Sequence, residues 1–145
     1  MPDRLRSRHA AALGAYLLFL AFVLGQRDAS LAAWVIRQTG RVVRLLGPDW
    51  LGTPVRVEFL LNVAMIVPAA FLVAMLFPRH PWANWVVYGF VAAGLVEGFQ
   101  GLFRPLRSAQ FVDVVANTTG VLLGVILALV VLRRTADSEE SRPPM

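Results

Sequence analysis

Carboxylates, amides and arginines gather in one stretch of an otherwise apolar chain, residues 97–124. Charged side chains inside an apolar segment are costly, so they are usually paired or functional. Three kinds of chemistry are open to this set. The charges can form a structural ion-pair network, the arginines can bind an anionic headgroup, or Glu97 and Asp113 can act as general acid and base.

The candidates for this chemistry share a polar side chain within or beside an apolar run. They are Glu58, Asn62, Glu97, Gln100, Arg104, Arg107, Asp113 and Asn117. Catalysis is the least supported of the three chemistries, because no nucleophile or metal-binding set accompanies the two carboxylates. We therefore assign no catalytic residue. The sequence leaves open whether the chain is an enzyme, and it favours a protein without enzymatic activity.

The composition is that of an integral membrane protein. Of the 145 residues, 57% are hydrophobic and 16% are charged, whereas a soluble domain carries about 25% charged residues. The chain has no cysteine and two histidines, which excludes a disulfide framework and metal sites built from thiolates or several histidines. We expect no metal and no cofactor. The net charge of +5 comes from arginine alone; arginine suits phosphate and carboxylate groups, although a GC-rich genome gives the same bias.

Apolar runs of membrane-spanning length predict an all-helical fold with four transmembrane helices in one domain, residues 1–134. The spans are predicted at about residues 10–26, 57–77, 84–103 and 111–132. The basic start of the chain and the apolar run after it also fit a signal peptide. No small-x-small cleavage site follows, however, which favours a retained helix. The polar tail, residues 135–145, is predicted to be disordered.

A different pattern predicts a helix in the membrane interface, between the first and second spans, over residues 31–46. Arg37, Arg41 and Arg44 share one helical face, and Trp34 with several aliphatic residues supplies an apolar one. The positive-inside rule does not fix the orientation, since each side of a four-span protein would hold seven arginines. The three arginines before the first span favour cytoplasmic N- and C-termini.

The polar residues of the last three spans are predicted to meet at one depth. Asn62, Glu97 and Asn117 each lie roughly 8–9 Å below the same membrane surface if the helix rises about 1.5 Å per residue. Glu58 and Asp113 lie closer to that surface. Because each polar stripe should turn away from lipid, we expect one polar pocket that opens to the outside.

Two G-x-x-x-G patterns predict close helix packing. Gly94 and Gly98 form the first, and Gly120 and Gly124 form the second. Such spacing lets two helix backbones approach closely. The pattern also arises by chance in glycine-rich membrane segments, but its presence on two consecutive helices favours a hairpin of the third and fourth spans.

Three of these segments resemble the VanZ-like family of small bacterial membrane proteins. They are Asn62–Pro68, Glu97-x-x-Gln100 followed by Arg107, and Asp113–Gly120, within a resemblance that covers about residues 10–132. The resemblance implies a four-helix protein of the bacterial inner membrane with no established reaction and no known cofactor. The name-giving member of the family is associated with low-level resistance to the glycopeptide antibiotic teicoplanin.

The expected function is recognition or shielding of an anionic component of the cell envelope by the polar pocket. The expected partners are the lipid bilayer and an anionic lipid or lipid-linked cell-wall precursor, and no nucleic acid is expected. Two alternatives stay open, an intramembrane enzyme acting on a lipid-linked headgroup and a small subunit of a larger membrane complex.

Overall fold

The protein is all-helical in the part of the chain that the structure describes. The computed structural model describes residues 3–25, 29–103 and 111–140. The elements are α1 (Asp3–Gly25), α2 (Ala29–Leu46), the short 3-10 helix η1 (Asp49–Gly52), α3 (Pro54–Leu76), α4 (Trp82–Phe103) and α5 (Phe111–Glu140). No strand occurs among these residues, which confirms the predicted all-α class.

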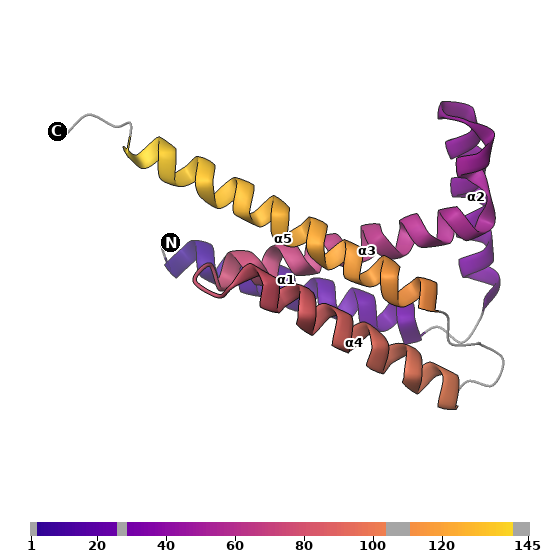
Figure 1. The fold of residues 1–145 in the computed structure, drawn as a ribbon, viewed down its shortest axis with the longest axis horizontal. Helices are drawn as coiled ribbons and strands as arrows, with labels where there is room; N and C mark the ends of the chain where they lie inside the picture. The colour runs from indigo at the N-terminus through magenta and orange to yellow at the C-terminus, as the bar shows by residue number, and fades with distance from the viewer. Residues whose placement is uncertain (1–2, 26–28, 104–110, 141–145) are drawn as a thin grey trace.

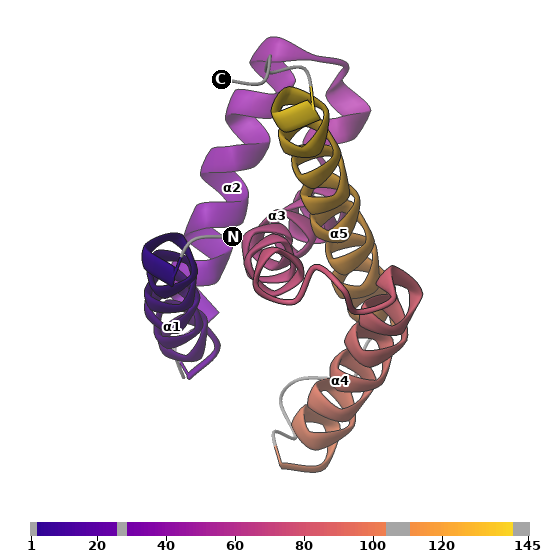
Figure 2. The same ribbon diagram turned by 90° about the vertical axis from the view of Figure 1, so that its left-hand side faces the viewer.

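The long helices form an open row rather than a closed bundle. Helix α3 packs most extensively against α5, α1 covers α3, and α4 covers α5, whereas α3 and α4 scarcely touch. Seen from one end, the order is therefore α1, α3, α5, α4 (Figure 2). Helix α2 runs across the end of this row where α3 begins (Figure 1), at the place predicted for the interfacial helix.

Two glycines allow the central pair of helices to pack closely. A Cβ atom added at Gly120 would lie 2.7 Å from the carbonyl oxygen of Val63, and one at Gly124 would lie 2.5 Å from that of Val67. The later glycine of α5 lies beside the later residue of α3, so α3 and α5 run parallel. The G-x-x-x-G pattern of α5 thus serves contact with α3, and not the expected contact with α4.

The other pattern, on α4, makes no close helix contact. A Cβ atom added at Gly94 or Gly98 would meet no heavy atom within 4 Å, which differs from the expected packing role. Helix α4 instead turns Gly89 toward α5, where an added Cβ would lie 2.6 Å from a methyl group of Val121. Gly94 and Gly98 are displaced from the contacting face because each residue advances about 100° around a helix.

Only part of the predicted membrane topology is matched by helix length and composition. Within the described residues, α3 and α5 are the two helices long and apolar enough to cross a membrane. Helices α1 and α4 occupy the places predicted for the other two spans. Pro68 lies inside α3, where it removes the hydrogen bond that another residue would donate to the carbonyl of Ala64.

Helix α5 continues beyond its predicted end. It runs to Glu140 instead of ending at residue 132, so the first part of the predicted disordered tail is helical. The Thr135 hydroxyl donates to the Leu132 carbonyl at 2.8 Å, and the Ser138 hydroxyl donates to the Arg134 carbonyl at 2.7 Å. These hydrogen bonds within the helix satisfy the polar side chains. Helix α5 can therefore continue past the end of the packed row (Figure 1).

A hydroxyl from α1 supports the proline-containing part of α3. Tyr16 donates a 2.8 Å hydrogen bond to the carbonyl of Met65, in the turn before Pro68. We predict that Tyr16→Phe lowers the free energy of unfolding by about 0.5–1.5 kcal/mol, the range for hydrogen bonds between membrane helices. Unfolding of the purified chain by SDS measures the change.

The other tyrosine provides a matched control. Tyr88 is half exposed, and within the described ranges its hydroxyl makes no hydrogen bond. Tyr88→Phe should therefore leave the unfolding midpoint in place. Equal effects of the two substitutions would show that the bond to Met65 contributes nothing to stability.

Candidate functional site

A side-chain hydrogen bond joins the two central helices at their polar ends. The Asn62 side-chain amide on α3 donates to Oδ1 of Asp113 on α5 at 2.9 Å, in a partly buried setting. Asp113 lies in the first turn of α5, where the helix dipole and unpaired backbone amides stabilise a negative charge. The structure thus brings together two residues that the sequence analysis placed in one polar set.

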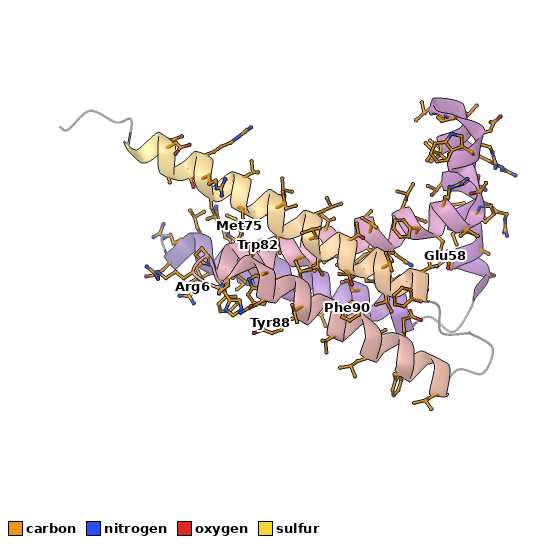
Figure 3. All side chains as sticks on the ribbon, viewed as in Figure 1. Arg6, Glu58, Met75, Trp82, Tyr88 and Phe90 are labelled. Atoms are coloured by element: carbon orange, nitrogen blue, oxygen red, sulfur yellow. The ribbon has the colours of Figure 1, made fainter. Side chains whose placement is uncertain are left out.

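Two further members of the set lie one helical turn away on the same helices. Glu58 precedes Asn62 by four residues on α3, and Asn117 follows Asp113 by four residues on α5, so each shares a face with its neighbour. Both side chains are half-buried. Figure 3 shows Glu58 near the start of α3, at the end of the molecule that carries α2.

Glu97 belongs to α4 and lies on the face of that helix that packs on α5. Its side chain is only 8% exposed, and it follows Gly89 and the buried Ala93 at intervals of four residues on α4. Because α4 packs on α5 and scarcely on α3, the α4 stripe does not join the α3 stripe directly. The side chains of Gln100, Arg104 and Arg107 lie outside the described residues.

Two cavities lie at opposite ends of the row, and none of the described polar candidates lines either of them. A small cavity lies at the far end of the row, beside His80 and Trp85. A groove of about 290 Å³ lies near the start of α3 and is lined by Leu51, Val55, Arg56, Phe59, Leu60 and Val112. In the described residues, Asn62 of α3 and Asp113 of α5 form a packed polar contact, and an apolar groove lies at the same end of α3.

Sequence reasoning did not find this groove. Its lining is almost entirely apolar, and Val55 and Phe59 repeat at the interval expected of any lipid-facing helix. The signal that was present is Arg56, which lies between them in sequence. An arginine beside an apolar stripe at the start of a membrane helix can hold an anionic headgroup above a hydrocarbon chain.

Four of the described arginines lie at the end of the molecule that carries α2. Arg56 Nη1 donates to the carbonyl of Trp50 at 2.6 Å, and its guanidinium carbon lies 4.9 Å from the centre of the Trp50 ring. Arg44 Nη1 donates to the carbonyl of Gly52 at 3.0 Å. Within the described ranges, no carboxylate pairs with any of the exposed arginines Arg37, Arg41, Arg44 and Arg56.

Close approach of two glycines fixes α2 at this end. A Cβ atom added at Gly40 would lie 2.8 Å from the carbonyl oxygen of Gly52, and both glycines are buried. With this face of α2 turned inward, its apolar residues remain exposed, including Leu45 at 84% and Leu46 at 85%. An exposed apolar face with arginines beside it is typical of a helix that lies in a membrane interface.

The comparison with known proteins agrees with the resemblance in the sequence. A family model described as VanZ/LLP1 matches residues 13–132, a range that begins within α1 and includes every polar candidate. Neither the curated proteins nor the solved structures contain a match to the chain. The matched range covers most of the 145 residues, so the chain belongs to the VanZ/LLP1 family.

Proposed function

We propose that this protein spans the bacterial inner membrane four times and recognises or shields an anionic component of the envelope. The observation that carries the proposal is the hydrogen bond between Asn62 and Asp113, at the end of the molecule that also carries the arginines of α2. This partly buried contact holds α3 and α5 in a fixed arrangement, and guanidinium groups that pair with no described carboxylate supply the attraction for phosphate or carboxylate.

Exposed apolar side chains support four spans. Helix α1 exposes Leu18 at 74% and Phe22 at 66%, and helix α4 exposes Leu95 at 70% and Leu102 at 79%. Large exposed apolar surfaces on a folded protein mark contact with lipid or with another protein. The exposed apolar surfaces of α1 and α4 support a place for both helices in the bilayer beside α3 and α5, with α2 in the interface at one surface.

The proposed orientation places both termini in the cytoplasm and the end that carries α2 outside. Arg4, Arg6 and Arg8, in the first two turns of α1, favour this arrangement. At the outer surface, recognition or shielding of an anionic lipid or lipid-linked cell-wall precursor would change access by glycopeptides such as teicoplanin. A periplasmic reporter fused at Ser108 should be active, and an inactive one would contradict the orientation.

The proposal is tested by measuring protein abundance and teicoplanin tolerance together in a susceptible host. The variants are Glu97→Gln, Asp113→Asn, Arg104→Gln and Arg107→Gln. We expect the two arginine variants to accumulate normally and to lose most of the tolerance, because anion binding needs their charge. Asp113→Asn should keep tolerance, since an asparagine oxygen can still accept the hydrogen bond from Asn62.

Other outcomes would point elsewhere. Loss of tolerance in both carboxylate variants at normal abundance would favour acid–base catalysis. Loss of abundance in all four variants would favour a purely structural network. Wild-type behaviour of all four variants would contradict the proposal outright.

A further inference from the structure

We infer that the groove near the start of α3 holds one acyl chain of an anionic phospholipid, with the lipid phosphate at Arg56. The inference rests on the proposed function, because it names the ligand class that the end of the molecule carrying α2 would take. It places that ligand in a site that the sequence analysis did not identify.

The groove has the lining that a hydrocarbon chain needs. Its walls come from three elements: Leu51 from η1, Val55, Phe59 and Leu60 from α3, and Val112 from α5. Its volume of about 290 Å³ is near the lower end of the range for ligand pockets, about 300–1,000 Å³. An open apolar groove of this size admits one chain from the surrounding lipid and excludes a charged group from its floor.

Arg56 supplies the charged end of the site. It lines the groove and is exposed. Its guanidinium is held by the hydrogen bond to the Trp50 carbonyl and by the Trp50 ring beneath it, a cation–π arrangement that restricts its orientation. A guanidinium has five N–H donors, so one backbone bond leaves donors for the bidentate recognition of phosphate.

Charge at this end selects an anionic lipid over a zwitterionic one. Besides Arg56, helix α2 contributes three exposed arginines, and α2 packs on η1 and α3. The carboxylates nearest to the groove lining in sequence are Asp49, Glu58 and Asp113, three against the four arginines, and Asp113 accepts the hydrogen bond from Asn62. A soluble anion would use the arginines but not the groove, so the apolar lining and the charge together fit a phospholipid.

Native mass spectrometry of the purified full chain tests the inference. The probes are dioleoylphosphatidylglycerol and dioleoylphosphatidylcholine, added separately in detergent. We expect preferential retention of phosphatidylglycerol. Two variants fill the groove from opposite walls, Leu60→Trp and Val112→Trp, and Arg56→Gln removes the charge. Each should weaken retention of phosphatidylglycerol about tenfold or more, as expected when a charge-assisted contact or the site for the acyl chain is lost.

Matched controls separate the groove from general effects. Leu123 has the same 46% exposure as Leu60 but does not line the groove, so Leu123→Trp should retain the lipid. Arg79, exposed in the turn between α3 and α4, serves as the control for charge as Arg79→Gln. Loss of retention in these controls to the same degree would overturn the inference.

Three further results would also overturn it. They are unchanged retention in both groove-filling variants, equal retention of phosphatidylcholine, and complete displacement of the lipid by soluble glycerol phosphate. The proposed function can fail separately. Teicoplanin tolerance that does not respond to the arginine variants would contradict that proposal, even if phosphatidylglycerol binds in the groove.

Discussion

Replacing Gly124 by alanine is expected to lower the free energy of unfolding by about 1–3 kcal/mol, the usual cost of overpacking a tight contact. The added Cβ would lie 2.5 Å from the Val67 carbonyl oxygen, 2.8 Å from the Ala70 Cβ and 2.9 Å from the Phe71 backbone nitrogen. None of these atoms is the end of a flexible side chain, so α3 and α5 must move apart. Separation of the two helices also stretches the contact between Asn62 and Asp113.

SDS-induced unfolding of the purified chain measures this effect, with Gly94→Ala as the control. A Cβ at Gly94 would meet nothing within 4 Å, and alanine is a better helix former than glycine by about 1 kcal/mol in water. The control should therefore leave stability unchanged or raise it. A Gly124→Ala variant as stable as Gly94→Ala would contradict the close packing of α3 on α5.

Asn62→Asp is expected to destabilise the protein by about 1–3 kcal/mol, because it removes the hydrogen-bond donor and faces Asp113 with a second carboxylate. The two groups meet at 2.9 Å in a partly buried site, where like charges are poorly screened. Adding Asp113→Asn to the same chain restores one amide and one carboxylate. The double variant should recover most of the lost stability.

Abundance in the membrane and the midpoint of SDS unfolding are the measurements for this pair. Rescue in the double variant shows that the two side chains contact each other, since independent substitutions would add their costs. Additive destabilisation, with the double variant worse than Asn62→Asp alone, would contradict the contact.

The helices could be predicted from the sequence because polar and proline-containing turns interrupt the apolar runs. Gly47–Asp49 ends the interfacial segment and Pro78–Pro81 separates two long helices, close to the observed boundaries. Depth predicted that the polar residues of α3 and α5 lie at the same end of the molecule. It grouped Asn62 with Asn117 and Glu58 with Asp113, however, whereas the structure joins Asn62 to Asp113. A rise per residue is enough to compare depths along helices that begin together.

Helix neighbours and faces could not be predicted in the same way. A G-x-x-x-G pattern shows that close approach is tolerated but does not name the partner, so Gly120 was assigned to α4 although it packs on α3. The expected polar pocket brought together residues of three helices, and in the described residues α4 packs on α5 and scarcely on α3. The groove could not be predicted from the sequence, because Val55 and Phe59 have the residue types that lipid-facing positions also carry.

The central claim is that the end of the molecule carrying α2 recognises an anionic envelope component, and one comparison of teicoplanin tolerance tests it most directly. The double variant Arg104→Gln with Arg107→Gln removes charge just before α5 begins, and Arg133→Gln with Arg134→Gln removes the same charge from the far part of α5. At matched abundance, we predict that the wild-type chain raises tolerance, that the first double variant loses most of the increase and that the second keeps it. Equal tolerance in both double variants, or no increase from the wild-type chain, would contradict the claim.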